Sequence, residues 1–101
     1  MGELGRLGGY IIFFKGDDFL YVEKARKRIS NKTVVEYTLT RKDGGYSIEC
    51  VEYGNDGIVN DRANVNEITG LFCVAKRIFN LIVNNGVTAC TLYDVICDLI
   101  C

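Results

Sequence analysis

The amino-acid sequence predicts one small α+β domain, in which a short antiparallel sheet packs against a C-terminal helical hairpin. Three observations support this class: apolar and polar residues alternate around an Asp-Gly pair in 34–53, apolar residues recur at helical spacing in 67–85, and an amphipathic stretch covers 91–101. A chain of 101 residues has the length of a single domain. Strands followed by helices are typical of two layers, so residues 1–101 are expected to form one such domain.

The clearest element is a β-hairpin in 34–53, which is rich in β-branched and aromatic residues on both sides of its turn. Asp43-Gly44 favours a type I′ turn, because both central residues of that turn need positive φ. This register places apolar pairs on one face and polar pairs on the other, as a half-buried sheet requires. The expected pairs are Leu39 with Ile48 and Tyr37 with Cys50 on the apolar face, and Thr38 with Glu49 and Thr40 with Ser47 on the polar face.

A second turn cluster, Gly54-Asn55-Asp56-Gly57, follows the hairpin. The segment 58–63 after it carries too many polar residues for a central strand, and it is either an edge strand or a loop. The sheet is therefore expected to be a hairpin or a three-stranded sheet over about residues 33–63.

The segment 67–85 predicts an amphipathic helix, because its apolar residues recur at i, i+3 and i+4. Asn64 with Glu67 resembles a capping box, and Asn85-Gly86 is a stop signal. A second helix is expected over 91–101, with Thr91 as its N-cap. The residues that widen the apolar side of the first helix are Val74, Leu81 and Val83.

Residues 10–32 leave two alternatives open. They form either a hairpin around 15–18 or a helix over 17–29, whose acidic start and basic end suit the helix dipole. The helix is the favoured alternative of the two. The glycine-rich residues 1–9 are expected to be flexible.

The composition argues against an enzyme. The chain has no histidine, which is the commonest general base and the commonest metal ligand in proteins. Asp94 and Asp98 lie one helical turn apart, and they are better explained as a capping residue and a solvated face than as an acid/base pair. We therefore expect no catalytic residues and no cofactor.

The chain has five cysteines and no C-x-x-C pair. Cys97 and Cys101 at i, i+4, with Cys73 and Cys90, form a possible zinc site, but free thiols that pack as small apolar side chains are the favoured interpretation. The sequence shows neither a signal peptide nor an apolar run long enough to span a bilayer. A cytoplasmic location without membrane attachment is expected.

Charge is distributed unevenly along the chain. Residues 24–42 hold seven bases and one acid, whereas residues 43–61 hold five acids and no base. A local basic cluster can bind phosphates even in a chain whose formal net charge is -1. Internal charge complementarity, or docking of an acidic protein partner, is the preferred explanation. The residues that would serve weak nucleic-acid binding by the cluster 24–32 are Lys24, Arg26, Lys27 and Arg28.

The C-terminal segment 87–100, with the strand 46–49, resembles a family of small clostridial proteins catalogued as a domain of unknown function. Members of that family end in a pattern like V-[ST]-P-x-x-L-x-D-V-I-x-D, and Ala89 stands here in place of its proline. The resemblance covers 35–100, and it implies the fold and a cytoplasmic location but no site residue. The matching residues are Val87, Thr88, Leu92, Asp94, Val95, Ile96 and Asp98.

Taken together, these features predict a non-enzymatic protein–protein interaction or regulatory module. The apolar flank at Val74 and Leu81, or an open strand edge, is the expected contact surface for a protein partner or for a second copy in a homodimer. Nucleic-acid binding is the alternative function.

Overall fold

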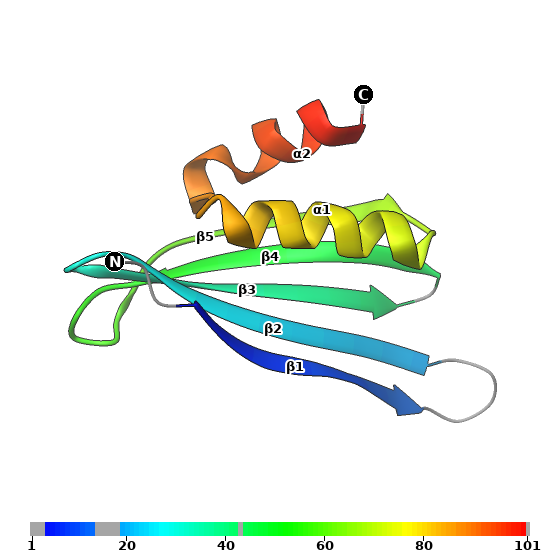
Figure 1. Ribbon diagram of the computed structural model, residues 1–101, viewed down its shortest axis with the longest axis horizontal. Helices are drawn as coiled ribbons and strands as arrows, with labels where there is room; N and C mark the ends of the chain where they lie inside the picture. Colours follow the sequence, from blue (N-terminus) through cyan, green and yellow to red (C-terminus); the bar gives the residue numbers. More distant parts are fainter. Residues whose placement is uncertain (1–3, 14–18, 43, 101) are drawn as a thin grey trace.

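The computed structural model describes the backbone of residues 4–13, 19–42 and 44–100, and the side chains of 21–41 and 44–100 (Figure 1). Within these described residues, five antiparallel strands lie in chain order in one sheet, and two α-helices follow them. The predicted α+β class is confirmed. The elements are β1 (Leu4–Phe13), β2 (Phe19–Ser30), β3 (Thr33–Lys42), β4 (Gly45–Tyr53), β5 (Val59–Thr69), α1 (Phe72–Asn84), the 3₁₀ turn η1 (Ala89–Thr91) and α2 (Leu92–Ile100).

Both helices pack on the same face of the sheet. α1 contacts β2, β3, β4 and β5, whereas α2 contacts β5, η1 and α1. The core joins alternate residues of the central strands, such as Val35, Tyr37 and Ile48, to buried residues of the helices, such as Phe79 and Leu92. We call this face the helix face, and the opposite face of the sheet the open face.

The β3–β4 hairpin has the predicted register. Leu39 pairs with Ile48 and Tyr37 with Cys50, and all four side chains are fully buried on the helix face. Gly44 has a φ of 85°, as the expected turn requires. The polar pairs, Thr38 with Glu49 and Thr40 with Ser47, also form as expected. Local turn chemistry and alternation were therefore sufficient to define this part of the sheet.

The segment after the second turn cluster is an edge strand, which was one of the two alternatives for it, but the strand continues to Thr69. The capping box at Asn64 and Glu67 is therefore wrong: both residues lie in β5, and Glu67 has a φ of 52° at an irregularity in the β4–β5 register. Pairing with the free edge of β4 satisfies the backbone here, so α1 begins only at Phe72 instead of 67.

The favoured helix over 17–29 is also wrong. β2 (Phe19–Ser30) pairs with β1 on one side and β3 on the other, as in the hairpin alternative. Leu4 already pairs with Lys27, so residues 4–9 belong to the sheet and not to the flexible start that was expected. Residues 1–3 and 14–18 lie outside the described residues. The sheet is thus larger than the expected 33–63.

The predicted stop of α1 at Asn85-Gly86 is confirmed. Gly86 has a φ of 62°, and its N–H donates to the carbonyl of Val83 at 3.2 Å. The N–H of Val87 donates to the carbonyl of Ile82, also at 3.2 Å, which completes a Schellman motif. The Nζ of Lys27 in β2 donates to the carbonyl of Asn84 at 2.7 Å and places a cation at the negative end of the helix.

The connector between the helices is attached to the sheet through buried polar contacts. The Tyr37 hydroxyl donates to the carbonyl of Val87 at 2.8 Å inside the core. The N–H of Ala89 donates to Glu52 Oε2 at 2.7 Å, which ties η1 to β4. α2 begins directly after Thr91, but the Thr91 hydroxyl donates to the carbonyl of Thr88 at 3.3 Å. Thr91 itself lies in η1, whose N-cap is Thr88 with an extended φ of -95° and ψ of 168°, so the expected N-cap at Thr91 is wrong.

Removing the Tyr37 hydroxyl should destabilise the protein while leaving its shape unchanged. Tyr37→Phe leaves the buried Val87 carbonyl with only the Cys50 thiol, 3.7 Å away, as a donor. We expect the free energy of unfolding to fall by about 1–2 kcal/mol in urea denaturation. Tyr53→Phe is the matched control, because Tyr53 is only half-buried, and it should change stability by less than about 0.5 kcal/mol. Equal effects of the two substitutions would contradict the role of this hydrogen bond.

Candidate functional site

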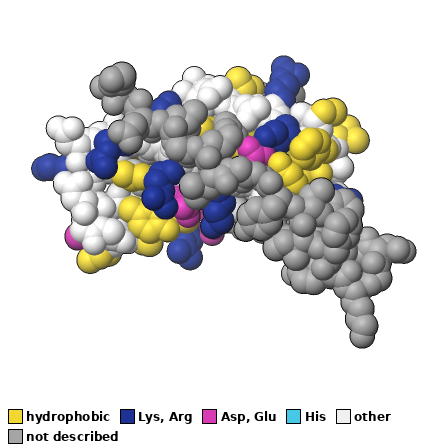
Figure 2. Space-filling model, turned by 60° about the horizontal axis from the view of Figure 1, so that its bottom comes forward, with side chains coloured by type: hydrophobic (Ala, Val, Ile, Leu, Met, Phe, Trp, Pro, Cys, Tyr) yellow, Lys and Arg dark blue, Asp and Glu magenta, His cyan; other side chains and the backbone are white. Residues whose placement is uncertain are grey.

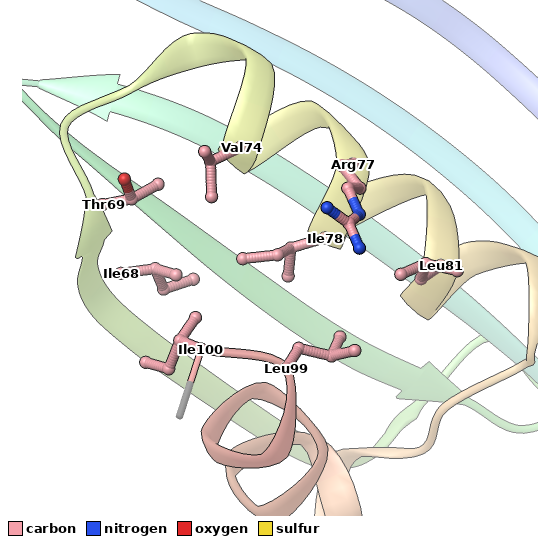
Figure 3. A pocket seen from close by; sticks show the side chains of 8 residues that line it. All are labelled: Ile68, Thr69, Val74, Arg77, Ile78, Leu81, Leu99 and Ile100. Atoms are coloured by element: carbon pink, nitrogen blue, oxygen red, sulfur yellow. The ribbon is translucent and has the colours of Figure 1, made fainter.

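An apolar groove opens between the two helices on the helix face. It has a volume of about 340 Å³ and lies where the C-terminal end of α2 faces α1 and the end of β5. Figure 3 shows side chains from all three elements directed toward this shared hollow. We call it the interhelical groove; its lining residues are Ile68, Thr69, Val74, Arg77, Ile78, Leu81, Leu99 and Ile100.

Six of the eight lining residues are apolar, and the groove is open to solvent at its rim. Leu81 is 36% exposed, Leu99 40% and Ile100 48%, whereas Ile78 is buried. Val74 and Leu81, which the sequence singled out as the surplus apolar flank of the first helix, both line the groove. Val83, the third residue of that flank, is instead fully buried in the core. Apolar surface left accessible in a concave site is typical of an interaction site.

The two helices that border the groove carry opposite charges. The charged residues of α1 are Lys76 and Arg77, and those of α2 are Asp94 and Asp98. Lys76 pairs with Glu23, whereas Arg77 lines the groove and forms no ion pair with another described residue. The groove therefore combines an apolar floor with one guanidinium that remains available to a partner.

The structure contains a buried carboxylate that sequence reasoning missed. Glu23 is only 3% exposed, and its Oε1 accepts a hydrogen bond from the Tyr21 hydroxyl at 2.8 Å and pairs with Lys76 of α1. The only sequence signal was a single acid between two apolar residues, Val22 and Ala25, and it was hidden by the helical interpretation of this segment. Paired in this way, Glu23 joins α1 to β2 and has the environment of a structural carboxylate.

The basic cluster 24–32 is divided between the two faces, because successive side chains of a strand point in opposite directions. Lys27 lies on the helix face, where it reaches the end of α1. Lys24, Arg26 and Arg28 lie on the open face, where Glu36 Oε2 is 3.0 Å from Arg26 and Oε1 is 3.9 Å from Lys24. Figure 2 shows basic side chains grouped with acidic ones on the described surface. The acid that balances Lys24 and Arg26 is Glu36, which lies within the basic segment 24–42 and not in the acidic segment 43–61.

The cysteines do not converge on a metal site within the described chain. Cys50 is buried, Cys73 and Cys90 are exposed, and Cys97 is half-buried; all four are free. Across residues 21–41 and 44–100, His, Cys, Asp and Glu side chains form no group of three or more that suits a metal ion. Cys101, the fourth residue of the zinc alternative, lies outside the described residues. In the part of the chain that the structure describes, neither helix has the length and apolar character needed to cross a membrane.

Two buried acidic groups have raised pKa values. Burial, with a smaller contribution from Glu52, raises the pKa of the Cys50 thiol from 9.0 to about 12. Burial likewise raises the pKa of the Tyr37 hydroxyl above its usual 10.0. Both groups stay protonated at neutral pH, so neither Cys50 nor Tyr37 has the properties of an activated nucleophile or base.

Comparison with known proteins finds no protein-family model, no curated protein and no solved structure that matches this chain. The resemblance of residues 35–100 to the clostridial family therefore stays a prediction. The surfaces of the molecule itself, above all the interhelical groove, are what bears on its function.

Alkaline pH should destabilise the native state through Cys50 and Tyr37. Above pH 9 the unfolded chain loses the Cys50 proton, whereas the folded chain keeps it until about pH 12, so the folded state binds more protons. The free energy of unfolding should fall by up to about 1.4 kcal/mol per pH unit for each such group. Urea denaturation between pH 7 and pH 11 measures this slope.

Cys50→Ala is the control for the alkaline effect. Between pH 9 and pH 10, where the thiol is the more fully deprotonated of the two groups in the unfolded chain, the variant should show a shallower decline than the parent protein. Identical slopes for parent and variant would contradict the buried, protonated state of this thiol.

Proposed function

We propose that this protein is a cytoplasmic, non-enzymatic protein–protein interaction module that associates with a second copy of itself through the interhelical groove. The observation that carries the proposal is the cluster of accessible apolar side chains at the groove, from Leu81 of α1 to Leu99 and Ile100 of α2. The four free cysteines within the described residues agree with a reducing compartment.

Burial of this apolar rim supplies the driving force for association. Removing apolar surface from water is favourable by about 25 cal/mol for each Å², and Leu81, Leu99 and Ile100 are each at least one third exposed in the isolated chain. Because these side chains lie beside a concave floor that includes Ile78, an apolar ridge of a partner can fill the groove and exclude water from it.

Charge favours a second copy as that partner. In a two-fold symmetric dimer, contacts are reciprocal: if α1 of one copy meets α2 of the other, the reverse contact also forms. In that arrangement the exposed Arg77 of each copy can pair with the exposed Asp98 of the other, once on each side of the axis. With a formal net charge of -1 per chain, long-range repulsion between two copies is small.

Sedimentation velocity across protein concentration tests this assembly. The parent protein should form a dimer within a range of about 10 μM to 1 mM, which is typical of a modest apolar interface. Leu99→Lys should weaken the dimer by at least about tenfold, because it places a charge in the apolar contact. Ile58→Lys is the matched control, since Ile58 is 63% exposed but lies outside the groove, and it should leave the dimer unchanged.

A charge-reversal cycle tests the orientation of the dimer. Arg77→Asp and Asp98→Arg should each weaken association by about tenfold, and the double variant should restore most of the lost affinity. Circular dichroism confirms that each variant is folded. A protein that stays monomeric throughout the concentration range, or equal effects of Leu99→Lys and Ile58→Lys, would overturn the proposal.

A further inference from the structure

A second concave site lies at one end of the sheet, away from the interhelical groove. It has a volume of about 480 Å³ and lies between β2, the start of β3 and the turn that connects β4 to β5. We call it the turn pocket; its lining residues are Arg26, Arg28, Val34, Tyr53, Gly54, Asn55 and Gly57. The volume is within the range of about 300–1,000 Å³ that is typical of small-molecule sites.

The strand register places these side chains on the open face. Arg28 pairs with Val34, and Val34 pairs in turn with Tyr53, so the three residues form one row across three strands. Directly paired residues of antiparallel strands point to the same side of a sheet. Their neighbours Val35 and Tyr37 alternate with them and are buried beneath the helices, so this row faces the other way.

The turn pocket has an excess of positive charge. Glu36 is the acid that pairs with Arg26 and Lys24, whereas Arg28 is exposed and has no ion pair with any other described residue. Asp56 of the adjacent turn directs its Oδ1 to the N–H of Ile58 at 3.0 Å. Two guanidinium groups at alternate positions of one strand suit an anion that accepts several hydrogen bonds, such as a phosphate or a carboxylate.

The lining of the turn pocket also includes an apolar and an aromatic side chain. Tyr53 and Val34 are both half-buried beside the arginines, and Tyr53 contributes a planar ring to the lining. Aromatic side chains stack on nucleic-acid bases whatever their identity, in sites where basic groups follow the phosphates. An aromatic ring next to two arginines therefore matches a ligand that joins a planar base to a phosphate.

We propose that the turn pocket binds a nucleotide unit, with its phosphate at Arg26 and Arg28 and its base against Tyr53. A free nucleotide and a single-stranded oligonucleotide share this chemistry. Because the pocket lies on the opposite face from the interhelical groove, the inference does not depend on dimer formation.

The experiment is a pair of titrations at low salt. Adenosine monophosphate is added to ¹⁵N-labelled protein and followed by amide chemical shifts, and a fluorescein-labelled ten-nucleotide uridine oligomer is followed by anisotropy. Shifts should concentrate at Arg26, Arg28 and the 54–57 turn, and the affinity should fall as salt rises, as phosphate binding requires. Binding of both ligands, or of the oligomer alone, identifies which source of nucleotide the pocket accepts.

Three variants separate this site from diffuse surface charge. Arg28→Ala and Tyr53→Leu should each lower the affinity by about tenfold, because one removes a phosphate contact and the other a stacking surface. Lys32→Ala is the matched control: it removes one exposed cation from the adjacent β2–β3 turn, outside the lining, and should lower the affinity by less than about threefold. Circular dichroism and urea denaturation verify that the variants are folded.

Several outcomes would overturn the proposal. Absence of binding by both ligands at about 50 mM salt excludes the site. Equal losses of affinity in Arg28→Ala and Lys32→Ala would show that the ligand is attracted to surface cations in general. An unchanged affinity in Tyr53→Leu would show that the nucleotide base does not stack on Tyr53. Equally tight binding of a glutamate-rich peptide would indicate an acidic protein segment as the ligand of the pocket.

Discussion

The hydrogen bond from Tyr37 to the carbonyl of Val87 anchors the connector between the helices to the sheet, and the arrangement of the two helices depends on where this connector lies. It places the connector between α1 and α2 directly over the fully buried middle of β3, inside the core. Glu52 holds the N–H of Ala89 two residues further on, so both ends of this short connector are anchored to the sheet. Together with the packing of Leu92 and Ile96 in the core, these two contacts hold α2 in place beside α1 and so define the interhelical groove.

Alternation along β2 gives the two faces of the sheet their different characters. On the helix face, Glu23 pairs with Lys76 of α1, and Lys27 donates a hydrogen bond to the carbonyl of Asn84 in the last turn of α1. On the open face, Arg26 and Arg28 contribute to the turn pocket. One basic strand thus stabilises the helical layer and supplies the charge of a separate surface, because each side chain is directed by strand geometry and not by its neighbours in sequence.

The candidate surfaces were only partly visible in the sequence. Val74 and Leu81 could be identified as surplus apolar residues of a helix, but the groove also needs Ile68, Leu99 and Ile100, which come from two other elements. Of the turn pocket, the sequence indicated only Arg26 and Arg28, as members of the basic cluster expected to bind phosphates. Its arginines and its tyrosine are 25 residues apart, from Arg28 to Tyr53, and only the register of three strands brings them into one row. The sequence signal that existed, a cluster of bases, indicated charge without indicating a face.

The sequence by itself determined the β3–β4 hairpin and the end of α1, since the Asp-Gly turn and the Asn-Gly stop act through a few neighbouring residues. Only the tertiary structure decided that residues 19–30 form a strand and that residues 64–69 are part of β5, in spite of helix-like local signals in both segments. The physical reason is backbone hydrogen bonding: each segment lies beside a strand with an unpaired edge. Pairing along that edge satisfies the backbone N–H and C=O groups of the segment and of the neighbouring strand. A short isolated helix would satisfy only its own backbone groups, and it would be marginally stable in water.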